Sequence, residues 1–568
     1  MTTRAPRSVV AGVLRSAQPR TAGWAAGVVF GILAASSTVA LLATSAYLIT
    51  RAAEQPPILY LSMAVVGVRA FALGRAVFRY LERLASHDAA FRQLEVVRVD
   101  LLRRLLPLAP DGLGRSRRGS MLSALVSDVD ELQNLPLRVV QPLLTSLGVA
   151  AIAVWVVALL SPAAALGLAV CLAAGGVLGS LAASRVAASA ERSIAPHRAA
   201  LADAVLDYLS SLEVLIAYGA EEEARQRVSR ADRDLTRALT RRAGGAGLAA
   251  AVLSLCAGLA VVWALLTGIP ALATPAEGGI DGPALAVIAL VPLAVFEIIA
   301  AVPLAVGAWR QVRSSAERIA GLAPSDVPAE LSHNAGTEVL AGDPHAPVVD
   351  LVDVAVRWPG QATPALLVPR LTIHRGERVL VEGASGSGKT TLAHLLVRFL
   401  DHEGEYLLSG QEVRTVGDDA IRTVVGLCEQ TPYLFDESVR QNLLFARDSA
   451  TDDDLVDVLD RVGLSGWLAS RGGLDARVGE RGALVSGGQA QRIALARALL
   501  HDFPVIIFDE PTANVEADLA DALLDDLLVA SGERTVVLIS HEDLRPGLVD
   551  RRVRVADGIL TPADRPVD

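Results

Sequence analysis

The sequence predicts a two-part membrane protein, in which an all-α bundle of six membrane-spanning helices precedes an α/β domain built around a phosphate-binding loop. Three observations predict this fold class. Hydrophobic residues make up 52% of the 568 residues and charged residues only 20%, which is too apolar for an average soluble protein. Six apolar stretches are each long enough to cross a bilayer. The only Lys of the chain, Lys389, lies in a Gly-x-x-x-x-Gly-Lys-Thr sequence at residues 383–390.

The apolar stretches and their flanks set the domain limits. They lie near residues 22–50, 58–80, 138–160, 162–184, 245–269 and 283–308. Each supplies the ~20 residues that a helix needs to cross ~30 Å of hydrocarbon. Residues 80–135 and 186–243 are rich in Ala, Leu, Arg and Glu with an apolar period near 3.6, so we expect them to extend the helices beyond the bilayer. We therefore place a transmembrane domain at residues 1–321, a Pro- and Gly-rich linker at 322–348 and a nucleotide-binding domain at 349–568.

Charge is distributed unequally between the two parts. Residues 1–320 carry 30 Arg against 22 acidic residues, whereas residues 321–568 carry 22 basic residues against 40 acidic ones. The acidic second part argues against a nucleic-acid partner, which requires a basic surface. Arg is concentrated in the N-terminal segment and after the second and fourth apolar stretches, and the link at 270–282 has no basic residue. The positive-inside rule therefore predicts that both termini are cytoplasmic.

The phosphate-binding loop lies between a predicted strand at residues 377–382 and a predicted helix from residue 391. Backbone N–H groups of the loop and of the helix N-terminus would hold the phosphates. Lys389 would reach the β and γ oxygens, and Thr390 would ligate Mg²⁺. The other 51 basic residues are Arg, whose wide planar fork does not suit this role. The predicted nucleotide contacts are Gly383, Ser385, Gly386, Ser387, Gly388, Lys389, Thr390 and Thr391.

Two further motifs follow the loop. Residues 505–510 form a run of Val, Ile, Ile and Phe ending in Asp509 and Glu510, which predicts a buried strand with two carboxylates at its end. Asp509 fits the metal-side acid of a P-loop ATPase, and Glu510 fits a residue that polarises the attacking water. The alternative for both is a solvated strand end. Ser486, Gly487, Gly488 and Gln489 precede a helix and predict a second anion-binding site.

In this order and spacing, the motifs resemble those of ATP-binding cassette (ABC) transporters. The resemblance implies an exporter-type transmembrane domain followed by an α/β P-loop ABC nucleotide-binding domain, with ATP and Mg²⁺ as cofactors. It implies that Trp358 stacks on adenine, that Gln430 contacts Mg²⁺ and the reaction centre, and that His541 acts with Glu510 in catalysis. It also implies that residues 486–489 are the signature motif, which covers the γ-phosphate held by the P-loop of a second half-transporter.

Two positions depart from the family pattern. Val485 opens the signature where Leu is usual, and Glu516 ends the loop after the second strand motif where Asp is usual. The second departure bears on communication between two ATP sites and not on ATP binding. Since six helices and one cassette make half of an exporter, the resemblance implies a second ABC half-transporter, a lipid bilayer and a small-molecule cargo.

Charged residues in the second and sixth apolar stretches are the candidates for cargo binding, because charges at bilayer depth are costly and usually functional. Arg69 and Glu297 lie about midway along their stretches, and we expect them to face the bundle interior and to pair, either structurally or with cargo. Further along the second helix a basic face recurs every four residues. It is either a solvated rim or an anion-binding entry site in which the histidine ligates a metal or haem iron. This face consists of Arg75, Arg79, Arg83 and His87.

The membrane half is similar to the CydC-type subunits of the heterodimeric CydDC exporters. The similarity rests on residues 44–49, 56–57, 68–71, 79–83, 87 and 91–92, and on 296–297. It implies a bacterial inner membrane, a CydD-type partner, a role in cytochrome bd assembly, and a low-molecular-weight thiol (cysteine- or glutathione-like) or haem as cargo. Two alternatives stay open: a homodimeric lipid or multidrug exporter half, and a membrane-anchored regulatory ATPase that moves nothing. The basic face and the 4% aromatic content argue against the first, and Glu510 with His541 argues for turnover.

Overall fold

The chain divides into two compact units. The computed structural model describes residues 7–113, 121, 124–272, 279–322, 327–332, 336, 338, 340–512, 517–541, 545 and 547–562. The membrane unit comprises Met1–Arg104 and Arg117–Ser325, and the nucleotide unit comprises Leu105–Ser116 and Asp326–Asp568. The nucleotide unit therefore includes a short segment that directly follows the second long helix of the chain.

The described residues of the membrane unit form helices joined by short turns and links. Six stretches are long and apolar enough to cross a membrane, which confirms the predicted six-helix bundle. They are Ala22–Ala53, Ile58–Leu108, Ala124–Leu160, Pro162–Ala183, Glu221–Ala271 and Gly282–Leu322. The individual elements are α1 (Arg7–Ala17), α2 (Ala22–Ala53), α3 (Ile58–Leu105), η3 (Ala124–Asp128), α5 (Val129–Leu132), η4 (Leu135–Val140), α6 (Gln141–Leu160), α7 (Pro162–Ser210), α8 (Leu212–Ala217), α9 (Glu221–Ala271), α10 (Gly282–Ile299) and α11 (Ala301–Leu322).

Local sequence signals place the starts of these helices. The Thr21 hydroxyl accepts the backbone N–H of Trp24 and caps α2, as Asp281 caps α10. Ser161 caps α7, and Pro162 takes the first helical position, where its fixed φ fits and no helical hydrogen bond is lost. Ser161 is thus the only residue between α6 and α7.

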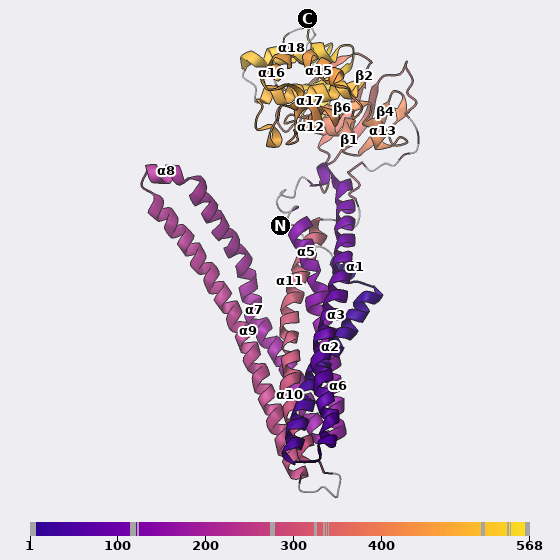
Figure 1. The fold of residues 1–568 in the computed structure, drawn as a ribbon. Coiled ribbons are helices and arrows are strands. Elements are labelled where there is room, and N and C mark those ends of the chain that lie inside the picture. Colours follow the sequence, from indigo (N-terminus) through magenta and orange to yellow (C-terminus); the bar gives the residue numbers. More distant parts are fainter. Residues whose placement is uncertain are drawn as a thin grey trace. The chain divides into compact units, whose positions relative to one another are not determined.

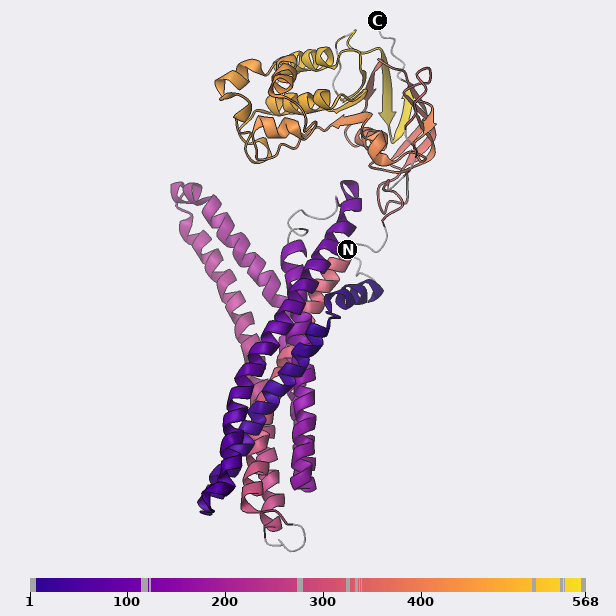
Figure 2. The same ribbon diagram turned by 45° about the vertical axis from the view of Figure 1, so that its right-hand side comes forward.

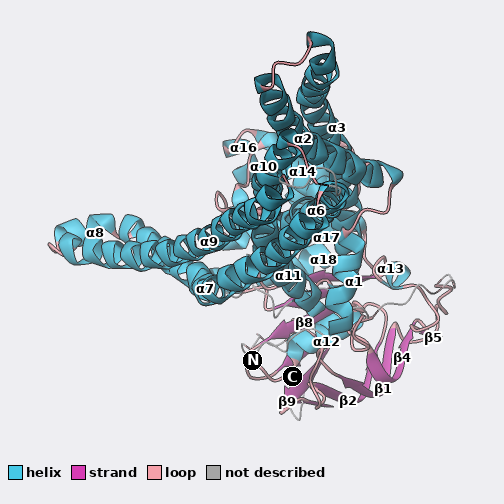
Figure 3. Cartoon of the chain, turned by 90° about the horizontal axis from the view of Figure 1, so that it is seen from below, coloured by secondary structure: helices cyan, strands magenta, loops and turns pink. Residues whose placement is uncertain are grey.

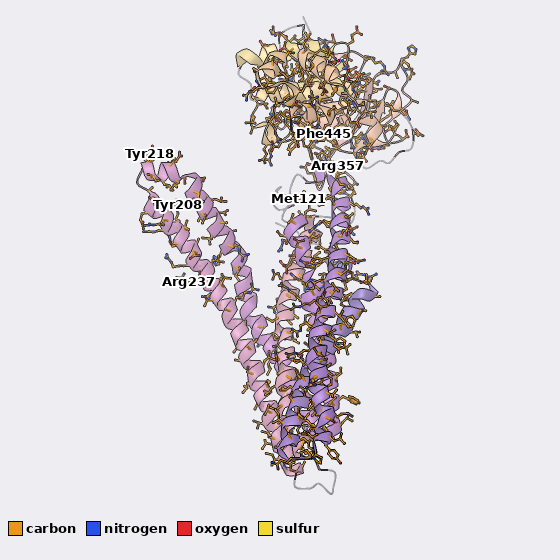
Figure 4. The ribbon with its side chains drawn as sticks, in the orientation of Figure 1. Met121, Tyr208, Tyr218, Arg237, Arg357 and Phe445 are labelled. Atoms are coloured by element: carbon orange, nitrogen blue, oxygen red, sulfur yellow. The ribbon has the colours of Figure 1, made fainter. Side chains whose placement is uncertain are left out.

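Helices α7 and α9 reach far beyond a bilayer. They contain 49 and 51 residues. At 1.5 Å per residue each is about 75 Å long, more than twice the ~30 Å hydrocarbon core. They run side by side as a hairpin with α8 at its tip (Figures 1 and 2), where Tyr208 and Tyr218 are labelled in Figure 4. The hydroxyl of Tyr208 donates to Glu221 at 3.2 Å across the tip. The predicted helical extension at 186–243 is therefore present, with breaks on either side of α8.

The other predicted extension, over residues 80–135, is interrupted. Helix α3 ends at Leu105 and is followed by two short 3-10 turns, η1 (Leu106–Leu108) and η2 (Asp111–Leu113). Pro107 and Pro110 explain the break, because proline lacks the N–H that a continuing helix requires and restricts the residue before it. Irregular helix with π-type turns resumes at Ala124.

A buried carboxylate joins two elements of the membrane unit. Asp128, at the end of η3, has only 9% of its side chain exposed and accepts the Nε–H of Arg318 at 2.9 Å. The hydroxyl of Ser315 donates to the same carboxylate at 3.1 Å. Both donors belong to α11, so this cluster fixes α11 against η3.

The nucleotide unit is an α/β domain, as predicted. Its ten-stranded sheet has the order β5-β4-β1-β2-β10-β9-β3-β8-β7-β6, shown in magenta in Figure 3. The strands are β1 (Val349–Val356), β2 (Leu366–Ile373), β3 (Arg378–Glu382), β4 (His402–Leu408), β5 (Gln411–Glu412), β6 (Val425–Cys428), β7 (Val505–Asp509), β8 (Thr535–Ser540), β9 (Arg551–Ala556) and β10 (Ile559–Pro562). The helices are α12 (Lys389–Leu396), α13 (Asp418–Ile421), α14 (Val439–Leu444), α15 (Asp452–Arg461), α16 (Ser465–Ser470), α17 (Gly487–His501) and α18 (Ala517–Ser531), with short turns η6 (Gly473–Asp475) and η7 (Glu480–Gly482).

The centre of this sheet is parallel and buried. Strands β9, β3, β8, β7 and β6 pair in parallel, and every residue of β7 and β8 is buried. In this register Glu382 pairs with Ser540, and Asp509 pairs with Ile539. The carboxyl ends of β3, β7 and β8 therefore meet at one edge, where α/β proteins bind their ligands.

Candidate functional site

The phosphate-binding loop leaves β3 at this edge and enters α12. Gly388 has φ +114°, a left-handed conformation that favours glycine, and α12 begins at the next residue. A Cβ atom at Gly383 would lie 2.3 Å from the carbonyl oxygen of Val555, so only glycine fits there. The hydroxyl of Ser387 is buried without a hydrogen-bond partner in the part of the chain that the structure describes. A cavity of about 900 Å³ opens beside the loop, and this loop has both the shape and the unused donor to take a phosphate.

Lys389 is nearly buried, with 5% of its surface exposed. Its Nζ donates to the carbonyl oxygens of Gly383 at 2.8 Å and of Ala384 at 3.1 Å. It also lies 3.4 Å from Oε1 of Glu510. The ammonium is thus held within the loop, at the point where phosphate oxygens would replace these carbonyl and carboxylate partners.

Asp509 ends β7 next to the start of α12. Its Oδ2 accepts the hydroxyl hydrogen of Thr390 at 3.0 Å. Burial raises the pKa of the Asp509 carboxyl, and the neighbouring Glu510 raises it further, while the hydrogen bond from Thr390 and the charge of Lys389 oppose the shift. A hydroxyl and a carboxylate side by side are oxygen ligands of the kind that Mg²⁺ prefers, so these residues fit a magnesium site.

Glu510 lies at the centre of the predicted catalytic residues. Its Oε2 accepts the side-chain N–H of Gln430 at 3.0 Å, and its Oε1 lies 3.6 Å from Nδ1 of His541. Its backbone has φ +47°, which is uncommon for a non-glycine residue, and its N–H is fixed by the carbonyl of Ile539 at 2.9 Å. The structure therefore brings together residues that directly follow β6, β7 and β8 and are up to 111 positions apart in the sequence.

Trp358 lies against the first turn of α12. Its indole N–H donates to the hydroxyl of Thr391 at 3.1 Å, and its ring centroid is 5.6 Å from that of His394. His394 in turn contacts Asp111 of η2 at 2.7 Å. The sequence analysis did not find His394 or Asp111, because they are 283 positions apart and belong to no motif.

The signature residues form a helix N-terminus instead of a wall of this cavity. Ser486 caps α17: its hydroxyl accepts the backbone N–H of Gln489 at 3.3 Å, and its own N–H donates to the Gln489 side chain at 2.9 Å. Among the described residues, none of 486–489 lines the cavity beside the phosphate-binding loop. Gly487 and Gly488 form the first turn of α17. Glu516, the other departure from the family pattern, lies outside the described residues.

A second cavity, of about 400 Å³, lies within the membrane unit between α2, α3, α6 and α10. Three of the predicted cargo residues line it: Arg79, Arg83 and Glu297. Glu82 and Gln141 also line it, and the side-chain amide of Gln141 donates to Glu82. Gln141 was not predicted, because it stands at the start of α6 without a motif.

The remaining predicted cargo residues lie elsewhere on α3. Arg69, Arg75 and His87 are exposed and do not line this cavity. The expected ion pair between Arg69 and Glu297 is absent from the described residues. Arg69 is ten residues, or about 15 Å along the helix axis, from Arg79, which shares the cavity with Glu297.

His87 has an aromatic neighbour but no ligand cluster. Its ring centroid lies 5.9 Å from that of Phe91. The described residues contain no group of three or more His, Cys, Asp or Glu side chains placed to hold a metal ion.

Comparison with known proteins agrees with this arrangement. The family described as "ABC transporter transmembrane region" matches residues 9–271, and the family described as "ABC transporter" matches residues 368–513. The "Glutathione/L-cysteine transport system ATP-binding/permease protein CydC" of Escherichia coli (strain K12) is 31% identical over 530 residues, covering 91% of this chain and 89% of that protein. The chain belongs to the ABC transporter family.

Within that family it is an exporter subunit similar to CydC and CydD proteins. The protein CydD of Bacillus subtilis (strain 168), of the same transport system name, is 28% identical over 540 residues, covering 93% of this chain and 91% of that protein. A solved structure titled "Structure of a bacterial Atm1-family ABC exporter with ATP bound" superposes with a TM-score of 0.72 over 94% of both chains at 20% identity, which shows the fold. An ABC cassette joined to an exporter membrane domain is an ATPase coupled to transport, and this chain is a multi-pass membrane protein of that kind.

Proposed function

We propose that this chain is the CydC-type half of a heterodimeric exporter that moves low-molecular-weight thiols of the cysteine or glutathione kind across a bacterial inner membrane. The observation that carries the proposal is the match over 91% of the chain to a protein named for glutathione and L-cysteine transport. The resemblance to CydDC exporters adds a role in cytochrome bd assembly. We keep the domain limits at residues 1–321, 322–348 and 349–568 as part of this proposal.

The geometry of the ATP site supports the proposal of a second half-transporter. Residues 486–489 cap α17 and do not line the cavity beside Lys389 in the described residues. A helix N-terminus with free N–H groups favours a negative charge, so the signature is suited to the γ-phosphate held by another chain. A CydD-type subunit is the partner that the proposal names, and a second copy of this chain is the alternative.

The residues of the ATP site divide the work of phosphoryl transfer. Loop N–H groups, Ser387 and Lys389 would position the β- and γ-phosphates, and Trp358 would stack on the adenine. Glu510, fixed by Gln430 and close to His541, would orient the attacking water and take up its proton. Thr390, Asp509 and Gln430 would hold Mg²⁺, which would supply positive charge to neutralise the phosphates of bound ATP.

The distribution of Arg supports the orientation. The N-terminal segment and the flanks of the long helical extensions carry Arg, whereas the link at 270–282 carries none. By the positive-inside rule, both termini and the tip formed by α8 would be cytoplasmic, and the starts of α3 and α10 would be on the opposite side.

Haem is the alternative cargo of the proposal. The observation that favours it is the exposed imidazole of His87 on α3, 5.9 Å from Phe91. A haemin titration of the purified pair tests this alternative. If His87 ligates the iron, the Soret band of His87→Ala differs from that of the wild type, whereas an unchanged band removes the ligand.

Transport into inverted membrane vesicles tests the main proposal. Vesicles that contain this chain and a CydD-type partner should accumulate labelled L-cysteine or glutathione when ATP is added. Vesicles that contain this chain alone should not. ATP-dependent uptake by the chain alone would favour the homodimer, and ATP hydrolysis by the pair without uptake of any thiol or haem would favour the regulatory ATPase.

A further inference from the structure

The cavity in the membrane unit has a charge pattern of its own. Its volume of about 400 Å³ lies within the ~300–1,000 Å³ range of small-molecule sites. Its wall contains two guanidinium groups, from Arg79 and Arg83, and two carboxylates, from Glu82 and Glu297. The formal charges of the wall therefore sum to zero, yet no ion pair joins these groups in the described part of the chain. Such a wall suits a molecule that carries both signs of charge.

Several polar groups in this wall lack partners. Over the described residues, Arg79, Arg83 and Glu297 form no ion pair. Gln141 is only 5% exposed. Its side-chain N–H donates to Glu82, and its Oε1 atom has no hydrogen-bond partner in the described part of the chain. Arg79, Arg83 and Glu297 are exposed, so their charges are accessible to a ligand. The buried Oε1 atom of Gln141 costs free energy without a partner, so a bound molecule that donates a hydrogen bond to it gains affinity.

The cavity lies at a depth that suits cargo arriving from the cytoplasm. Arg79 is 21 residues after the start of α3 at Ile58, or about 32 Å along the helix axis. Glu297 is 15 residues after the start of α10 at Gly282, or about 22 Å. In the orientation proposed above, both helices start on the side away from the cytoplasm. At about 22 Å and about 32 Å, these two residues lie near the cytoplasmic boundary of a ~30 Å hydrocarbon layer.

We infer that this cavity binds the α-amino-acid head of a zwitterionic cargo. Arg79 and Arg83 hold the α-carboxylate, since guanidinium groups bind carboxylates through paired hydrogen bonds. The α-ammonium has three N–H donors, and the wall offers three acceptors for them: Glu82, Glu297 and the Oε1 atom of Gln141. The inference rests on the proposed function, because it takes the cargo to be a small molecule collected in the membrane unit.

This assignment explains how one site serves two different thiols. L-Cysteine and glutathione place their thiols differently, but both carry an α-carboxylate beside an α-ammonium, which in glutathione belongs to the γ-glutamyl residue. The cavity therefore selects the α-carboxylate and α-ammonium of the cargo and tolerates differences in the remainder of the molecule. A porphyrin with two propionates and no ammonium would leave the carboxylates of Glu82 and Glu297 facing like charges, which disfavours haem in this cavity.

Gly31 keeps the cavity open on the side of α2. A Cβ atom at Gly31 would lie 3.0 Å from Oγ1 of Thr145, 3.5 Å from Cγ of Glu82 and 3.8 Å from Nε2 of Gln141. A larger side chain there would occupy the volume next to the proposed ammonium position without changing any charge.

Competition for uptake tests the inference in the assembled pair. Vesicles that contain this chain and its partner are given labelled L-cysteine, ATP and a non-thiol reductant, with an excess of one unlabelled competitor. Glutathione should compete, whereas cysteamine, which lacks the carboxylate, and N-acetyl-L-cysteine, which lacks the ammonium, should compete at least tenfold more weakly. Equal competition by all three thiols would overturn the inference.

Variants that remove single charges test which residues bind the α-carboxylate and which bind the α-ammonium. Arg79→Gln should raise the KM for L-cysteine about tenfold to a hundredfold and remove the discrimination against cysteamine. Glu297→Gln should remove the discrimination against N-acetyl-L-cysteine. Arg92→Gln and Glu95→Gln, exposed positions further along α3, are matched controls that should keep both preferences. Gly31→Val should raise the KM without altering either preference. If uptake by Arg79→Gln and Glu297→Gln falls while the discrimination against cysteamine and N-acetyl-L-cysteine is retained, these two residues have only a structural role and the inference is overturned.

Failure of the inference is distinguishable from failure of the proposed function. Thiol uptake without selection for the head leaves the function standing and overturns the inference. Uptake of L-serine or L-alanine with the same head selection, but not of thiols, leaves the inference standing and overturns the thiol assignment. Uptake of neither thiols nor other α-amino acids overturns both.

Discussion

The cavity beside the phosphate-binding loop and the cavity lined by Arg79 and Glu297 are built in opposite ways. At the ATP site, residues from distant parts of the sequence converge because parallel strands end at one edge. The charged and catalytic candidates there already have a protein partner, because Lys389, Gln430 and His541 each lie within 3.6 Å of the carboxylate of Glu510. In the membrane cavity, Arg79, Arg83 and Glu297 lack such partners among the described residues. The difference indicates that the first site is preorganised for one reaction, while the second is completed by what it carries.

The largest effect is expected where the preorganisation is tightest. Glu510→Gln keeps the size of the side chain but removes the carboxylate that we propose orients the attacking water, so ATP hydrolysis by the pair should fall about 100-fold or more. Phosphate release is the measurement. Glu533→Gln, at an exposed position of the same unit, is the control and should hydrolyse ATP at the wild-type rate. ATP hydrolysis by Glu510→Gln at the wild-type rate would contradict the view that the ATP site is preorganised around this carboxylate.

The membrane cavity predicts a contrast within one helix face. Arg75 and Arg79 are one turn apart on α3, and the sequence alone treats them alike, but only Arg79 lines the cavity. Arg79→Gln should therefore raise the KM for L-cysteine at least tenfold, and Arg75→Gln should raise it by less than threefold. Uptake kinetics in vesicles measures both. Equal effects would mean that the whole face, and not the cavity, contacts cargo.

A stability difference should separate an ion pair whose carboxylate is buried from a pair in which both side chains are exposed. Asp128→Asn removes the charge that holds Arg318 and Ser315 of α11, and we expect a loss of about 1–3 kcal/mol in the membrane unit. Asp130→Asn removes the ion-pair partner of Arg98, and both of these side chains are about half exposed. We therefore expect this variant to lose less than ~1 kcal/mol of stability. Thermal unfolding of the detergent-solubilised protein measures both variants, and the reverse order would contradict the role given to Asp128.

The smallest effect concerns the pH dependence of the nucleotide unit. Burial raises the pKa of Asp509 in the folded, unliganded protein, so its contribution to stability is complete below the ordinary Asp pKa of about 3.9 and is lost as pH rises through the folded value. In EDTA, Asp509→Asn should therefore unfold at a slightly higher temperature than the wild type at pH 7. This advantage should disappear as pH falls toward 4. A variant less stable than the wild type at pH 7 without Mg²⁺ would contradict the burial argument.

The sequence predicted the bundle and the ATP-site residues because both follow local rules. Apolar length defines the six helices, and the loop at 383–390 needs glycine and Lys389 at fixed spacing. Contacts between side chains distant in sequence were not predictable, as His394 with Asp111 and Gln141 with Glu82 show. The periodicity that united Arg75, Arg79 and Arg83 places residues on one face of a helix, but it does not say where along that face another helix closes a cavity.

The measurement that tests the central claim most directly is ATP-driven accumulation of labelled L-cysteine by proteoliposomes containing the purified pair. The account predicts accumulation by the wild type, none by Glu510→Gln at any cysteine concentration, and accumulation by Arg79→Gln that recovers only at high cysteine concentration. Wild-type accumulation that is equally strong without ATP or in Glu510→Gln would contradict the claim that ATP turnover in this chain drives its cargo across the membrane.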